Sequence, residues 1–115
     1  MIAGIYNITC EQGSTFTRTF TIQQPDGTVY NLAGFSARLQ IRRDVDSTTT
    51  IFTASTATGN ITMSALFGEI TVDITATQTA TLTRDGVYDL EIFNSQGVVY
   101  KVVKGRFTLA KEVTR

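Results

Sequence analysis

A strict two-residue alternation over residues 15–22 constrains the fold of this chain more than any other feature. Threonine fills every second position, and the positions between hold Phe16, Arg18, Phe20 and Ile22. Because successive strand side chains point to opposite faces, this period predicts a β-strand with one apolar face. A lone guanidinium on an apolar face is costly to bury. We therefore expect Arg18 to reach solvent at an end of the fold, to pair with Asp73 or Asp89, or to face another subunit.

Other segments of the chain show the same period or the same β-branched and aromatic composition. Strands are predicted at residues 29–32, 35–42, 51–54, 61–63, 69–74, 98–103 and 106–109, and around Tyr88, Leu90 and Ile92. Turns are predicted at residues 25–27 and 95–97, and a polar loop at residues 43–50. Gly105 is expected to mark a β-bulge.

One short helix is expected at residues 75–82, because Thr75 and Gln78 have the spacing of a capping box and Leu82 would close the turn inward. The whole chain, residues 1–115, then forms one domain: an all-β, Ig-like antiparallel β-sandwich of about 7–9 strands. Tyr88 has the sequence position of a tyrosine corner, whose hydroxyl would bond to upstream backbone. The alternative is a half-buried aromatic residue of a strand.

Composition excludes several classes of chemistry. The chain has no histidine and one cysteine, so it cannot build a Ser-His-Asp triad, a Cys-His pair or a typical zinc site. Cys10 is interpreted as a small buried group. Asp44 and Asp46 are read as a solvated loop. Asp89 and Glu91 are read as surface acids on one strand face, and Asp73 is a candidate neighbour. We predict no catalytic residue, metal or cofactor.

Charge and segment composition bear on partners and location. The formal net charge is zero, which disfavours nucleic acid and anionic membranes as partners. The N-terminal residues lack the pattern of a signal peptide, and no apolar run has the length of a membrane span. A single cysteine fits folding in a reducing cytosol.

Four short motifs carry a family resemblance that extends over nearly the whole chain. They are Gln12-Gly13 before a strand, the turn Asp26-Gly27, the segment Asn31-Leu32-Ala33-Gly34, and Gly86-Val87-Tyr88. In this order the chain resembles the N-terminal domain of phage baseplate upper proteins and related small virion proteins of tailed phages. The resemblance implies a domain that docks on the baseplate. Since the sequence stops at Arg115, an adaptor, tail or decoration role is expected rather than receptor binding.

The resemblance thus implies a non-enzymatic structural component of a tailed-phage virion, made and assembled in the host bacterial cytoplasm. The expected role is a tail or baseplate adaptor or assembly protein, in several copies among other virion proteins. A capsid decoration protein is the alternative, followed by a module that binds carbohydrate or single-stranded nucleic acid. Protein interfaces favour aromatic and arginine anchors. The expected interface residues are Ile2, Ile5, Tyr6, Arg18, Arg42, Arg43, Lys101, Lys104 and Arg106.

Overall fold

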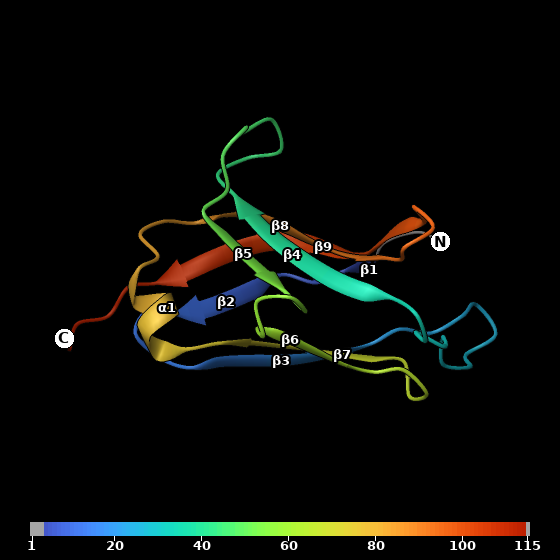
Figure 1. Cartoon of the computed structure of the whole chain (residues 1–115). Helices are drawn as coiled ribbons and strands as arrows, with labels where there is room; N and C mark the ends of the chain where they lie inside the picture. The colour runs from blue at the N-terminus through green and yellow to red at the C-terminus, as the bar shows by residue number, and fades with distance from the viewer. Residues whose placement is uncertain (1–3, 115) are drawn as a thin grey trace.

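Two β-sheets packed face to face enclose the core in the computed structural model, which describes residues 4–114 (Figure 1). Sheet A consists of β1 (Gly4–Ile5), β2 (Ile8–Glu11), β4 (Ser36–Arg42), β5 (Phe52–Ser55), β8 (Gly86–Phe93) and β9 (Val99–Ala110). Sheet B consists of β3 (Phe16–Thr21), β6 (Ile61–Ser64) and β7 (Glu69–Ile74). The helix α1 (Ala76–Ala80) closes one end of the sandwich.

The order of the strands follows that of an immunoglobulin-like domain with one strand added beside C. Sheet A contains the neighbours β9-β8-β4-β5, and sheet B runs β3-β7-β6. These correspond to the G-F-C-C′ and B-E-D strands of that fold. The predicted all-β, Ig-like sandwich is therefore confirmed. We predicted antiparallel sheets, and this part of the prediction was wrong for sheet A. There β1 and β2 both run parallel to β9.

Most of the predicted strands lie where the periodicity indicated, and Phe16, Phe20 and Ile22 are buried as expected. The capping box of α1 is also confirmed. The backbone N–H of Gln78 donates to the Thr75 hydroxyl at 3.1 Å, and the N–H of Thr75 donates to the Gln78 side chain at 3.0 Å. The helix has five residues, fewer than predicted. Its packing is fixed by Thr79 at its last turn, which is fully buried.

Two predictions about strand 29–32 and the bulge were wrong. Residues 29–32 form no strand, and Val29 makes only an isolated bridge with Gln23. The bulge in β9 lies at Val102, because the register to β8 shifts between Leu90 and Glu91. Gly105 stays in register, and a glycine is needed there because any Cβ would overlap the carbonyl oxygen of Tyr6.

Tyr88 ties the N-terminal segment to the middle of sheet A. It is buried on β8, and its hydroxyl donates to the backbone carbonyl of Tyr6, between β1 and β2. The predicted bond to upstream backbone is therefore present, but it crosses to a segment far away in the sequence, which differs from the few-residue closure of a tyrosine corner. Burial, reinforced by Tyr6, raises the pKa of Tyr88 above its usual range, although Arg18 acts in the opposite sense. The hydroxyl therefore remains a donor.

The first prediction concerns this hydrogen bond. Tyr88→Phe should lower the free energy of unfolding by about 1–3 kcal/mol, because the Tyr6 carbonyl loses its side-chain donor in a partly buried setting. The measurement is urea denaturation at neutral pH. Tyr100→Phe is the matched control, since the Tyr100 hydroxyl makes no hydrogen bond within residues 4–114. Equal losses in both variants would contradict the assigned role.

Candidate functional site

An open, charged groove crosses the outer face of sheet A. It has a volume of about 590 Å³ and lies between β1, β4, β8, β9 and the loop that follows β4. Five of the predicted interface residues line it: Ile5, Arg42, Lys101, Lys104 and Arg106. The same groove includes Asp89, Asp44 and Val45. Side chains predicted separately from three parts of the sequence thus share one surface.

Strand alternation explains why these side chains meet. On β4 the buried residues Leu39 and Ile41 alternate with Gln40 and Arg42, which face outward. On β9 the buried Phe107 places Lys104 and Arg106 on the outer face. Side chains of one parity on each strand therefore converge outside the sheet, while those of the other parity fill the core.

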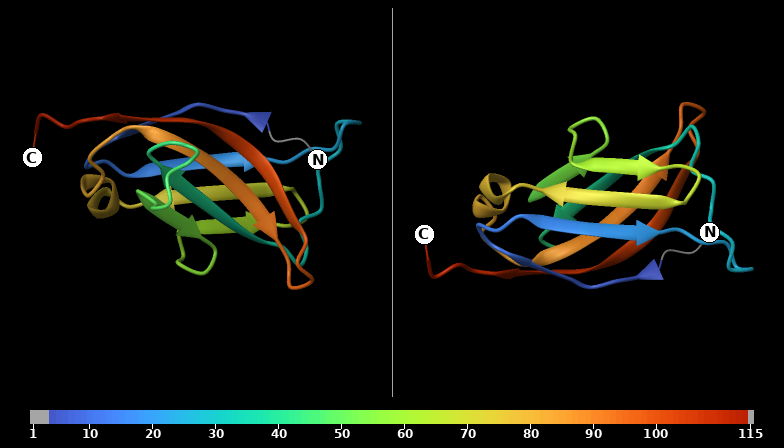
Figure 2. Two further views of the ribbon diagram at one scale, coloured as in Figure 1. Left: turned by 90° about the horizontal axis from the view of Figure 1, so that it is seen from above. Right: turned by 90° about the horizontal axis from the view of Figure 1, so that it is seen from below.

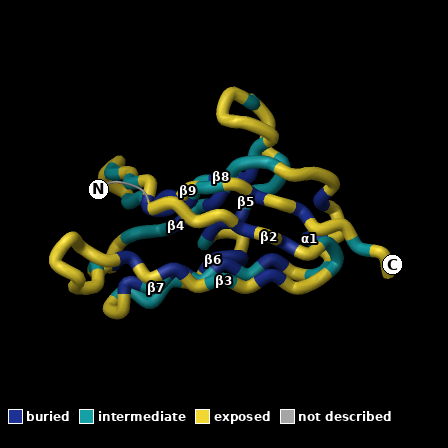
Figure 3. The backbone as a smooth tube through the Cα atoms, turned by 180° about the vertical axis from the view of Figure 1, so that it is seen from behind, coloured by how far each residue is buried: buried dark blue, intermediate teal, exposed yellow. Residues whose placement is uncertain are grey.

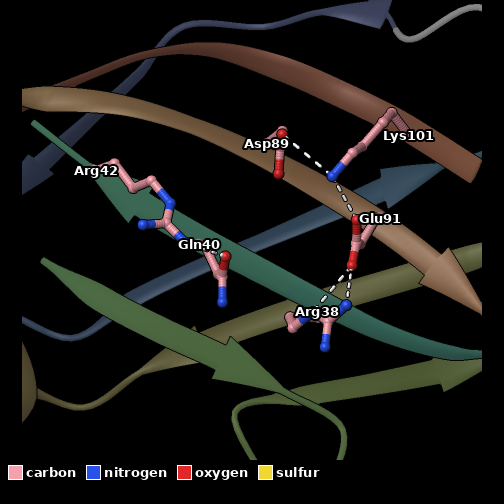
Figure 4. A network of polar contacts seen from close by, with 6 residues as sticks. All are labelled: Arg38, Gln40, Arg42, Asp89, Glu91 and Lys101. Atoms are coloured by element: carbon pink, nitrogen blue, oxygen red, sulfur yellow. Dashed lines mark hydrogen bonds and ion pairs between the residues drawn. The ribbon is translucent and has the colours of Figure 1, made fainter. Parts of the chain in front are cut away.

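A carboxylate on this outer face, that of Glu91, is buried between two cations (Figure 4). Arg38 on β4 bonds to one oxygen of Glu91, with its Nε at 2.9 Å, and Lys101 on β9 bonds to the other. Lys101 also lies 3.5 Å from a carboxylate oxygen of Asp89. Only 6% of Glu91 is exposed, because the long side chains of Arg38 and Lys101 cover it.

The two cations keep Glu91 ionised. Burial by itself raises the pKa of the Glu91 carboxyl, but hydrogen bonds and charge from Lys101 and Arg38 outweigh it, and the net shift is downward. Burial likewise favours neutral Lys101, but its bond to Glu91 and the charge of Asp89 raise the pKa of this lysine overall. The network therefore keeps fixed charges across β4, β8 and β9 near neutral pH.

Arg42 supports the wall of the groove. Its guanidinium donates to the Ser47 carbonyl at 3.1 Å and to the Gln40 side chain at 3.2 Å. These bonds anchor the loop of residues 43–50, which rises from the outer face of sheet A (Figure 1) and is largely exposed (Figure 3). At its tip, 85% of Val45 is exposed. The loop thus presents an apolar side chain beside a charged groove.

Three cations in the groove have no carboxylate partner among residues 4–114. They are Arg42, Lys104 and Arg106. Asp89 is engaged by Lys101, and Asp44 lies 3.7 Å from Arg43 at the loop. The groove therefore presents net positive charge although the whole chain is neutral.

The remaining predicted residues lie elsewhere. Arg43 lines a second hollow beneath the loop of residues 43–50, and Ile2 lies outside the described residues. Tyr6 and Arg18 contact each other at the side of the sandwich, where β3 lies at the edge of sheet B (Figure 2). Gly4 and Ile5 form the strand β1, which pairs with β9 of sheet A.

Arg18 does not pair with either of the acids that were suggested. Asp73 accepts a bond from Thr17 at 2.7 Å on the outer face of sheet B, and Asp89 lies on sheet A beside Lys101. Arg18 is half-buried, with its guanidinium 5.2 Å from the centre of the Phe16 ring and 5.8 Å from that of Tyr6. Its Nε is buried without a hydrogen-bond partner within residues 4–114.

The energetic terms at Arg18 nearly offset one another. An unsatisfied buried donor costs about 1–3 kcal/mol. A cation over an aromatic ring gains about 0.5–2 kcal/mol, depending on exposure, and Arg18 has two such rings. Arg18 is therefore tolerated on the inner face of β3 but not fully satisfied there.

Sequence reasoning missed the part played by Arg38 and the exposed pair Leu66 and Phe67. Arg38 was recognised as outward-facing, but its position opposite Glu91 depends on the register of β4 with β8. Leu66 and Phe67 are 75% and 66% exposed in the turn between β6 and β7. The sequence signal for this exposed pair was the position of two large apolar residues directly before a glycine, which is typical of a turn.

Several interpretations of isolated residues can be compared with their surroundings. Cys10 is fully buried on β2, as expected, and burial raises the pKa of its thiol. Asp44 and Asp46 are exposed on the loop, as expected. Within residues 4–114, no group of three metal-ligating side chains lies together, and no helix has the length and hydropathy to cross a membrane.

No protein-family model matches the chain, and no curated protein matches it in sequence.

The second prediction concerns the pH dependence of the Glu91 network. The pKa of Glu91 is lower in the folded protein than the value of about 4.3 in the unfolded chain. The ion pairs of Glu91 therefore stabilise the fold fully above about pH 4.3. This stabilisation is lost as the pH falls through the pKa of Glu91 in the folded protein. Glu91→Gln should cost about 1 kcal/mol at pH 7, since both cations are half-exposed. The measurement is urea denaturation between about pH 7 and pH 3.

The difference between wild type and Glu91→Gln should shrink toward zero at the acid end of this range. Glu69→Gln is the control, because Glu69 makes no ion pair within residues 4–114. A difference for Glu91→Gln that is the same at every pH would refute the assignment.

Proposed function

We propose that the protein is a structural component of a tailed-phage virion, an adaptor or assembly protein of the tail or baseplate that binds its neighbour through the groove of sheet A. One observation carries the proposal most directly: three cations without carboxylate partners in the described part of the chain, and two exposed apolar side chains, Ile5 and Val45, surround one open groove. The family resemblance of the sequence supplies the virion context.

The lining of the groove favours a protein partner over a small ligand. Small-molecule pockets are mostly apolar and enclose their ligand, whereas this groove is open and lined largely by charged and polar side chains. Protein interfaces place apolar anchors beside charges that complement the partner. The partner surface that fits is therefore acidic, with apolar residues opposite Ile5 and Val45.

The same lining argues against single-stranded nucleic acid. Such sites combine a basic path with exposed aromatic rings on which bases stack. The only aromatic residue of the groove is Tyr88, and it is 3% exposed. Lys104 and Arg106 would attract phosphates, but the groove lining among residues 4–114 offers no exposed ring to hold a base.

The third prediction tests this function in assembled particles. The wild-type chain should be retained in purified phage particles and found in the tail fraction by mass spectrometry. Lys104→Glu combined with Arg106→Glu should reduce its retention by about tenfold or more, because two cations of the groove become acids facing an acidic partner. Both positions are exposed, so the change leaves the core intact.

Lys111→Glu is the matched control, since Lys111 is exposed but lies outside the groove. Recovery of the wild type with capsids instead of tails would favour a decoration protein. Absence of the wild type from particles would refute the virion role, and equal loss in the Lys111 variant would refute the role of the groove.

A further inference from the structure

The strand β3 offers an open edge on the side of the sandwich away from β7. Among residues 4–114 it pairs with β7 alone, and it ends sheet B on that side (Figure 2). The N-terminal strands, which could have covered this edge, pair with β9 of sheet A instead. An uncovered strand edge presents backbone donors and acceptors to any extended segment that approaches it.

The hydrogen bonds of β7 show which residues of β3 serve this edge. The N–H of Asp73 donates to the Asn60 carbonyl at 2.7 Å, so Asp73 is bonded toward the side of β6. Its partner across the ladder, Thr17, is therefore in a non-hydrogen-bonded pair. By alternation, Thr17, Thr19 and Thr21 direct their backbone groups to the open edge.

Arg18 lies on the inner face of this same edge. Its guanidinium lies between the rings of Phe16 and Tyr6, and its buried Nε has no acceptor within residues 4–114. A strand added beside β3 would place a side chain on the inner face about 4.5–5.5 Å from Arg18, measured between Cβ atoms. A carboxylate there would neutralise the charge and accept the unsatisfied donor.

We propose that the open edge of β3 binds an extended segment of another protein by strand addition, with an acidic residue of that segment paired to Arg18. This surface is separate from the groove of sheet A and does not depend on it. A second copy of this chain is the wrong partner, because pairing of two β3 strands around residue 18 would bring two guanidinium groups together. An inward charge on an edge strand disfavours such self-pairing.

The decisive probe is the full chain with Arg18→Glu, whose own β3 strand carries a carboxylate at the required position. Wild type alone and the variant alone should each remain monomeric, while an equimolar mixture should form a heterodimer in analytical ultracentrifugation. We expect association at least about tenfold tighter in the mixture than in either protein alone.

Two controls separate strand addition from other association. Thr19→Pro in the wild-type chain removes the N–H that faces the open edge, a place where proline is tolerated, and should abolish the heterodimer. Arg18→Gln mixed with the Arg18→Glu variant keeps the edge but removes the charge pair. This mixture should associate more weakly than the mixture of wild type with the Arg18→Glu variant.

A peptide keeps the test valid if the Arg18→Glu variant does not fold. A blocked peptide copying residues 14–22 with Arg18→Glu should slow amide exchange at Thr17, Thr19 and Thr21 of the wild-type protein. The same peptide with glutamine at that position should have a smaller effect. Monomers in the mixture together with unchanged exchange would overturn the proposal. A wild-type homodimer that Thr19→Pro dissociates would also overturn the proposal, since the edge would then bind a second copy of the chain.

Discussion

The pairing of the N-terminal segment with β9 determines how both candidate surfaces are built. The hydroxyl of Tyr88 holds the Tyr6 carbonyl, and Gly105 leaves the space that this approach requires. Because β1 and β2 extend sheet A, Ile5 lines the groove on its outer face. Because they do not extend sheet B, the edge of β3 stays open. One choice of strand partner thus has consequences on two sides of the sandwich.

The outer faces of the two sheets differ in chemistry. On sheet A, long charged side chains cross-link neighbouring strands, and Glu91 is enclosed by its two cations. On sheet B the outer face carries mostly short hydroxyl side chains, with the acids Glu69 and Asp73 among them, and the bond of 2.9 Å between Thr19 and Thr71 is typical of it. Charged groups such as Lys104, which has no carboxylate partner among residues 4–114, supply attraction to another surface. Short hydroxyl groups that bond to each other supply little attraction to another surface. The part of sheet B that we propose as a binding surface is therefore its edge.

Much of the fold was predictable because its signals are local. The alternation over residues 15–22 identified β3 and its buried face, and the Thr75–Gln78 spacing identified the cap of α1. The bulge was not predictable, since Gly105 suggested it while Val102 forms it. The groove was predictable only as a set of separate residues. That Ile5 and Arg106 would meet on one surface follows from the register of β1 and β9, which no local pattern contains.

The sequence by itself determined the period of each strand, the face that each side chain takes, the all-β class and the position of the helix cap. It also placed Arg18 on an inner face. Only the tertiary structure decided that this arginine lies between Tyr6 and Phe16 and not beside an acid. The physical reason is range: side-chain direction follows from the backbone of a few residues, whereas strand pairing joins segments far apart in the chain and depends on packing of the whole core.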